Sequence, residues 1–270
     1  MNETFLKRRS FAILGAIGVF QYALGSATSF AQTMSGLDAV KKSGSLRIGW
    51  GVWVPYMFLD PKTRQVTGIT VSIGDALARN LGVKAEFVET TWATMVAGLQ
   101  ADHYDMTMPF IITEERMKAV LFTDPILKSN WCLVVPESKV KNYQSWQDLN
   151  KPGMRISATL GSSAPRFMAM LDKTDHLMMK DGSDSIAQLL TGQADAWLTQ
   201  YDAFRTAQQQ HPDLAVVPGP AIGQENVAFA VRKEDTTLKA ALDGQIAELK
   251  RSGELLKMIG TYGLNESSIA

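Results

Sequence analysis

The sequence has little of several features that mark common protein classes. Its 270 residues include a single cysteine, Cys132, so no internal disulfide can form and the fold must rest on its apolar core. Basic and acidic residues balance at 27 each, without the positive excess that nucleic-acid-binding proteins carry. The three histidines, His103, His176 and His211, are scattered without the spacing of metal ligands. We therefore expect no nucleic-acid partner, no metal site and no other cofactor.

The first 31 residues have the pattern of an export signal. "MNETFLKRR" is short and basic, "SFAILGAIGVFQYALG" is apolar but short and broken by glycine, and Ser29–Ala31 supplies the small residues of a cleavage site. The pattern predicts a signal peptide over 1–31, cleavage near Ala31, and a periplasmic chain that starts at Gln32. An N-terminal membrane anchor is the alternative, against which the length of the apolar run argues. "RRSFAI" also fits a twin-arginine signal loosely, so the export route stays open.

The 239 residues that remain allow one large domain or two lobes of roughly 100 residues each. They contain 24 basic and 26 acidic residues, because the removed segment holds three basic residues and one acidic residue. A net charge of −2 gives no polybasic face for a membrane surface. No later segment is apolar over the length that a membrane span needs.

Short apolar runs alternate with helical patterns along this mature chain. Such alternation predicts an α/β fold with largely parallel sheets. Strands are expected at 46–50, 84–89, 104–108, 154–158, 194–199 and 214–219. Helices are expected at 71–81, 92–100, 113–120, 163–171, 184–192 and 236–253. Ligands of such folds bind beyond the carboxyl ends of the strands, often against helix N-termini.

Arg116 occupies a position of that kind, in "PFIITEERMKAV" (109–120). Thr113 is expected to cap the helix that follows the strand and its loop. An arginine one turn into the helix can turn back over the strand ends and hold a carboxylate through its planar fork. It can equally pair with Glu115 or Asp124 on a solvated surface, and spacing alone does not decide between the two.

The ordered motifs together resemble the bacterial periplasmic solute-binding proteins of family 3, the polar amino-acid class that serves ABC importers. The resemblance covers nearly the whole mature chain. It rests on "LRIG", "TGITVSIGDALARNLG", "AEFVETTWATMVAGLQADHYDMTM", "ITEERMKAVLFTDP", "LGSSA", "LLTGQADAWLT", "FAVRKED" and "LDGQIAELKRSGELLKMIGTYG". It implies a transport protein that is monomeric, binds a small carboxylate-bearing solute and has an ABC permease of the inner membrane as partner.

The implied fold is the two-lobed clamshell of type II, with mixed, mostly parallel sheets and two crossings between the lobes. Lobe 1 is expected over 32–129 and 228–270, and lobe 2 over 130–227. The chain would leave lobe 1 near Ser129–Trp131 and return near Glu225–Phe229.

The resemblance also implies a ligand site. Arg116 falls at the position that clamps the ligand carboxylate, and Gly161, Ser162 and Ser163 fall at a turn that holds the same carboxylate with N–H groups. The residue types are compatible with a turn at the start of a helix, because glycine permits the turn, Ser163 can cap the helix, and Pro165 suits its first turn. An ordinary capped helix is the plainer interpretation.

Aromatic and apolar residues complete the implied site. Trp53 and Trp92 fall at ligand-contacting positions, while the loop before Arg116 has Phe110 and Ile111 where a hydroxyl residue is usual. The other tryptophans are expected to pack in the core or at the hinge: Trp50, Trp131, Trp146 and Trp197.

Gln200 is the difference from the family pattern that bears most on the chemical class of the ligand. Amino-acid binders usually place an aspartate there to hold the α-ammonium, and a neutral amide does not neutralise a buried charge. The resemblance therefore implies an amino acid, an amino-acid derivative or an organic acid. A cyclohexadienyl-dehydratase-like enzyme and a ligand-binding sensor accessory are the alternatives. We expect no catalytic residue, because the position of the dehydratase glutamate looks to be Ala203.

Overall fold

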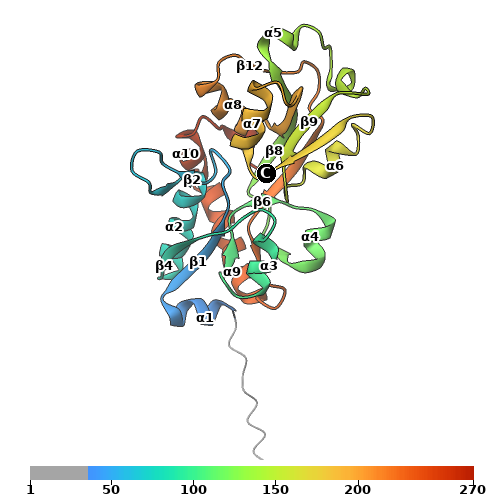
Figure 1. The fold of residues 1–270 in the computed structure, drawn as a ribbon. Coiled ribbons are helices and arrows are strands. Elements are labelled where there is room, and N and C mark those ends of the chain that lie inside the picture. The colour runs from blue at the N-terminus through green and yellow to red at the C-terminus, as the bar shows by residue number, and fades with distance from the viewer. Residues whose placement is uncertain (1–35) are drawn as a thin grey trace, which may run out of the picture. The chain divides into compact units, whose positions relative to one another are not determined.

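The computed structural model describes residues 36–270 (Figure 1). The predicted signal peptide (1–31), its cleavage near Ala31 and the start at Gln32 lie outside these residues. Within them, no helix combines the length and the apolar character that crossing a bilayer requires.

Lobe 1, as we use the term, is built on a five-stranded sheet in the order β4-β1-β5-β14-β7. Strands β4 and β5 pair parallel to β1, and β14 pairs antiparallel to β5 and β7. The strands are β1 Ser45–Trp50, β4 Lys84–Glu89, β5 Met106–Thr107, β7 Leu121–Phe122 and β14 Ala230–Val231. A separate two-stranded sheet pairs β2 Phe58–Leu59 with β3 Val66–Thr67.

Helices bury their apolar faces against this sheet in one core. Helix α2 ends as its sequence predicts, at Gly82, which adopts the left-handed conformation with φ of 77°. Four buried leucine and isoleucine side chains line the inner face of α9 at helical spacing. The helices of this lobe are α1 Gly36–Ser43, α2 Ile69–Leu81, α3 Met95–Gln100, α4 Glu114–Ala119, α9 Thr236–Arg251, α10 Glu254–Gly260 and the 3₁₀ turn η2 Glu266–Ser268.

Lobe 2 is built on a second sheet, in the order β10-β9-β11-β8-β13-β6, with β12 paired to β8. Successive residues of β8 point to opposite faces, so Trp131 and Leu133 join one core cluster while Cys132 and Val134 join another. The strands of this sheet are β6 Phe110–Ile111, whose residues pack in the lobe 1 core, β8 Leu127–Pro136, β9 Arg155–Thr159, β10 Asp175–Met179, β11 Ala196–Gln200, β12 Leu214–Val216 and β13 Gly223–Ala228.

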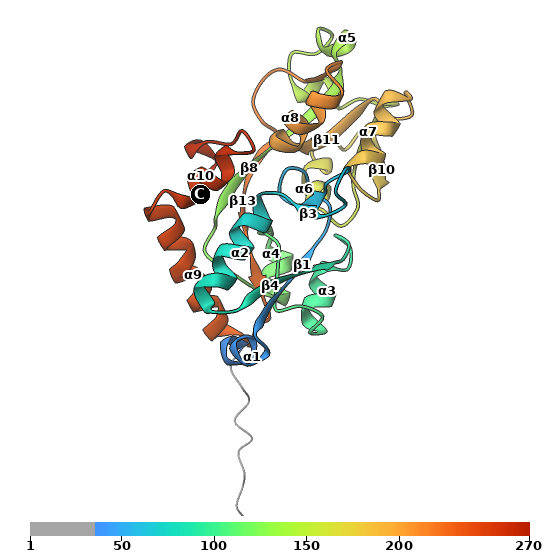
Figure 2. The ribbon, with the colours of Figure 1, turned by 90° about the vertical axis from the view of Figure 1, so that its left-hand side faces the viewer.

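Helices α7 and α8 cover one face of this sheet, where they share a core cluster with β8 and β11 (Figures 1 and 2). Helix α6 packs into the cluster on the other face. The helices of this lobe are α5 Glu137–Val140, the 3₁₀ turn η1 Trp146–Leu149, α6 Ala164–Met168, α7 Gly182–Leu190 and α8 Tyr201–Gln210.

Strands β8 and β13 run between the two cores as an antiparallel pair, with residues 127–131 opposite 223–227. The lobe 1 core uses residues up to Leu127 and again from Val227, whereas the lobe 2 cores use residues between them. Both sheets are mixed, as expected, but antiparallel pairs are more frequent than predicted because the crossing strands run in opposite directions. The boundaries at 129/130 and 227/228 fall inside β8 and β13 and stay a prediction.

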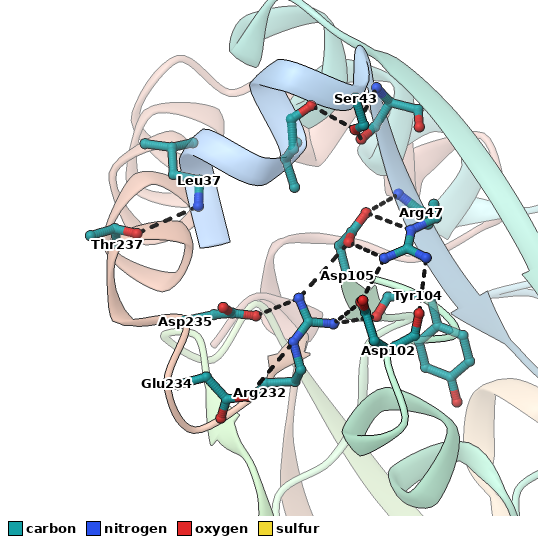
Figure 3. A network of polar contacts seen from close by, with 12 residues as sticks. Leu37, Ser43, Arg47, Asp102, Tyr104, Asp105, Arg232, Glu234, Asp235 and Thr237 are labelled. Carbon is teal, nitrogen blue, oxygen red and sulfur yellow. Dashed lines mark hydrogen bonds and ion pairs between the residues drawn. The ribbon is translucent and has the colours of Figure 1, made fainter. Parts of the chain in front are cut away.

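An ion-pair network ties lobe 1 together on the side where α9 begins (Figure 3). Arg47 of β1 contacts Asp105 at 2.6 Å and Asp102 at 2.7 Å. Arg232 also reaches Asp102, at 2.8 Å, and Asp235 at 2.7 Å. Because Asp105 and Asp235 are almost fully buried, the arginines compensate carboxylates that would otherwise be costly inside the protein.

Candidate functional site

A cavity of about 390 Å³ is lined by residues of both lobes. The size lies within the range of small-molecule sites. Lobe 1 contributes Val52, Trp53, Val54, Trp92, Ile111 and Arg116. Lobe 2 contributes Trp131, Thr159, Ser162, Ser163, Gly182, Ser183, Ile186, Trp197, Leu198, Thr199, Gln200, Ala203, Thr206, Ala207, Gln210 and His211. Seven of the nine residues that the sequence assigns to the ligand therefore meet in one cavity.

The side chain of Arg116 is positioned by the short helix α4 that carries it. Thr113 caps this helix as predicted, because its hydroxyl accepts a hydrogen bond from the Arg116 backbone N–H at 3.2 Å. The guanidinium donates to the Ile111 carbonyl at 2.6 Å and to the Gly161 carbonyl of lobe 2 at 3.0 Å. It also lies over the ring of Phe110, 4.5 Å from the ring centre.

Arg116 has no carboxylate partner within ion-pairing distance among residues 36–270. Burial lowers the pKa of its guanidinium to about 10, and the charges of Glu225 and Glu115 offset part of that shift. The group therefore stays charged at neutral pH. Two of its five N–H donors are engaged, and three remain for an anion.

The turn across the cavity is built differently from the sequence prediction. Gly161 adopts a positive φ of 76°, as the prediction required, but the Ser163 side chain does not cap α6. The Ser163 hydroxyl donates instead to Glu225 of β13, at 2.8 Å. Glu225 also accepts from Trp131 Nε1 at 2.8 Å and pairs with Arg166. The capping prediction was wrong because a residue far along the chain competes for the hydroxyl.

Trp53 and Trp92 form an aromatic wall on the lobe 1 side. Their rings meet edge to face with centres 5.7 Å apart, and Trp92 Nε1 donates to the Val52 carbonyl at 3.1 Å. Trp53 is 7% exposed, and its Nε1 has no hydrogen-bond partner among the described residues. Because this nitrogen is buried, Trp53 contributes other parts of its indole to the cavity lining.

Phe110 and Gly161 lie outside the cavity lining. Phe110 is 1% exposed and supports Arg116 from beneath, while Gly161 contributes its carbonyl to Arg116. Both therefore contact Arg116, which itself lines the cavity.

Gln200 lines the cavity as the last residue of β11 and immediately precedes α8. Asp202, two residues later, faces away: it lines a second cavity together with Tyr56, and it is 9% exposed. The 22 residues that line the main cavity include no aspartate or glutamate, and Arg116 is their one arginine or lysine. This lining favours an anion over a cation.

Sequence reasoning missed part of the lining. Trp131 and Trp197 were expected only to pack in the hinge or core; both are buried, and both also line the cavity. The small residues of α7 and α8 carry no chemical signal of their own. Their spacing on α8, with Ala203, Thr206, Ala207 and Gln210 at i, i+3, i+4 and i+7, is the one sign that they share a face.

Comparisons with known proteins agree with this architecture. The sequence profile of the bacterial extracellular solute-binding proteins, family 3, matches residues 46–265. The L-cystine-binding protein TcyJ of Escherichia coli K12 is 27% identical over 247 residues, which are 90% of this chain and 91% of that protein. Cyclohexadienyl dehydratase of Pseudomonas aeruginosa is 27% identical over 200 residues, 72% of this chain and 74% of the enzyme. The crystal structure of the Neisseria gonorrhoeae solute receptor for L-cysteine superposes with a TM-score of 0.80 at 25% identity, covering 88% of this chain and all of that one.

Proposed function

The chain belongs to the bacterial extracellular solute-binding proteins of family 3, and we propose that it captures a small carboxylate-bearing solute in the periplasm for an ABC importer. A permease of the inner membrane would be its partner. The relatives named for cystine and cysteine support the role of a binding protein for amino acids or related acids.

One observation carries the carboxylate assignment. Arg116 is partly buried and charged, and no carboxylate of the described residues lies within ion-pairing distance of it. Its remaining N–H donors match the two oxygens of a carboxylate, which a planar guanidinium can hold through two parallel hydrogen bonds. A solute that supplies this anion would satisfy a charge that is already desolvated.

Replacing Arg116 by alanine tests the assignment. We expect Arg116→Ala to cost about 2–5 kcal/mol of binding free energy, or roughly 30-fold or more in affinity, because the solute carboxylate loses its charged partner. Isothermal titration calorimetry measures the loss. Lys118→Ala is the matched control, since it removes the same charge from an exposed position of the same helix. Equal affinity for wild type and Arg116→Ala would refute the assignment.

The surroundings of Gln200 support a solute without a free α-ammonium. Two carboxylates that could substitute for the missing aspartate are engaged or turned away. Glu225 binds Arg166, Ser163 and Trp131, and Asp202 lines the second cavity. Burying an ammonium against a neutral amide would cost several kcal/mol. We therefore favour an organic acid or an acylated amino acid over a free amino acid.

A further inference from the structure

The cavity does not end at the arginine clamp; it continues into lobe 2 as a groove between α7 and α8. Lining residues follow α8 from Ala203 near its start to Gln210 at its end, and His211 comes next. A helix of ten residues is about 15 Å long, so the groove continues far beyond the space that a carboxylate and its α-carbon occupy.

The floor of the groove is largely apolar, and small residues line its walls. Trp197 of β11 forms the floor, and Thr199, two residues on, faces the same side. Gly182 and Ser183 of α7 and Ala203 and Ala207 of α8 line the walls. A Cβ atom added at Gly182 would lie 3.6 Å from the Trp197 ring, which places the start of α7 directly beside this floor.

The two ends of the cavity differ in chemistry. At the clamp end lie the charged Arg116, which is suited to carboxylate oxygens, and the residues Trp53 and Trp92 of the aromatic wall. Along the groove, Ile186, Trp197 and Ala207 offer apolar surface. The far end is polar and partly open to solvent, with Gln210 exposed and His211 half-buried.

We propose that the ligand is an elongated monocarboxylate whose apolar chain lies in the groove between α7 and α8. This inference rests on the proposed carboxylate role of Arg116 and adds a second determinant of specificity, the length of the chain. A chain that reaches Gln210 and His211 can end in a polar group, because both side chains offer hydrogen-bonding atoms there.

Straight-chain monocarboxylates of four, six and eight carbons test the proposal by calorimetry on the exhaustively dialysed protein. Burial of methylene groups in an apolar groove predicts a gain of roughly two- to fourfold in affinity for each added carbon. Ala207→Leu fills the groove from α8, and Ser183→Leu fills it from α7, at a position whose side chain is exposed. Both variants should lose the gain with chain length, so that octanoate binds them no more tightly than butanoate does.

Ala187→Leu is the matched control, because this exposed residue of α7 lies outside the cavity lining. It should keep the chain-length dependence of wild type. The groove assignment would be refuted if wild-type affinity did not change with chain length, or if Ser183→Leu still gained affinity with each added carbon. Neither result would refute the carboxylate role of Arg116. If no acid of any length binds to wild type, the proposed carboxylate function fails, and the groove assignment fails with it.

Discussion

Asp202 is a carboxylate enclosed beside the second cavity, at the first turn of α8. Its Oδ1 accepts a hydrogen bond from the Ala203 N–H at 3.0 Å, whereas Oδ2 has no partner among the described residues. Burial raises the pKa of the Asp202 carboxyl to about 6, and the Tyr56 hydroxyl and backbone N–H groups offset part of the rise. The ionised form is therefore disfavoured in the folded protein.

This raised pKa fixes the sign of a pH effect on stability. The protonated Asp202 carboxyl makes its full contribution to the free energy of unfolding below about pH 4, near its pKa in the unfolded chain. That contribution is lost as the pH rises through about 6, its pKa in the folded protein. Asp202→Asn, which cannot ionise, should exceed wild type in unfolding free energy by up to about 3 kcal/mol at pH 8 and match it near pH 4. Thermal unfolding across this range measures the difference. The exposed Asp184→Asn is the control, and a pH-independent difference at Asp202 would contradict the prediction.

In our interpretation, Gln200 determines whether the site accepts a ligand with an α-ammonium. Gln200→Asp would place a carboxylate in the cavity lining and could neutralise an α-ammonium. We expect the variant to gain thermal stabilisation from free amino acids, whose α-ammonium pairs with the new carboxylate. It should lose stabilisation from their N-acylated counterparts, because a neutral amide leaves the buried carboxylate without a compensating charge. A thermal-shift screen of such pairs measures both. Strong stabilisation of the wild type by a free amino acid alone would show that Gln200 does not exclude the ammonium.

At the scale of elements, the turn before α6 carries a requirement for glycine. Gly161 has a φ of 76°, and a Cβ atom there would lie 2.6 Å from the Ala93 nitrogen of lobe 1. The backbone strain would be present in any state, but the clash arises only where the lobes meet. Gly161→Ala should therefore weaken ligand binding at least tenfold, through a loss of more than 1.4 kcal/mol in the closed form.

Gly192→Ala separates the two effects. Gly192 has a similar φ of 71° but no atom within 4 Å of an added Cβ. It should lose about 1 kcal/mol of unfolding free energy through strain, with no change in affinity. Calorimetric titration and thermal unfolding of both variants provide the comparison. Equal affinities for the two variants would mean that the turn does not approach lobe 1 in the bound state.

Local signals in the sequence predicted the elements well where the interactions are local. Thr113 caps α4 and Gly82 ends α2, and both patterns involve residues within one or two turns. Ser163 is the opposite case, since its hydroxyl is taken by Glu225, 62 residues away. The groove between α7 and α8 was also hidden from the sequence, because small residues identify a cavity only after the neighbouring helices have been placed.

At the scale of the whole molecule, the described lobes meet at the cavity. Arg116 of lobe 1 bonds the Gly161 carbonyl of lobe 2, and Gly161 lies against Trp92 and Ala93. The sequence predicted two lobes through resemblance, and two sheets with separate cores agree with it. The positions of the residues that face the cavity depend on how the lobes close, which local sequence patterns do not encode.

A ligand that contacts both lobes should favour this closed arrangement by differential affinity. Small-angle X-ray scattering should show a smaller radius of gyration when the tightest-binding monocarboxylate is added than in its absence. Arg116→Ala at the same ligand concentration is the control, since it should remain uncompacted. An unchanged radius at saturating ligand would contradict closure as the mode of capture.

The paired crossing of β8 and β13 has a consequence for the entropy of binding. Residues 127–131 and 223–227 form a continuous ladder, and β13 also pairs with β6. Ordering a flexible linker costs about 1–2 kcal/mol of conformational entropy for each residue that is fixed. The residues of this crossing are already hydrogen-bonded, so a closure that bends them would freeze little backbone freedom. Closure therefore subtracts little backbone entropy from the free energy that the contacts in the cavity provide for binding the solute.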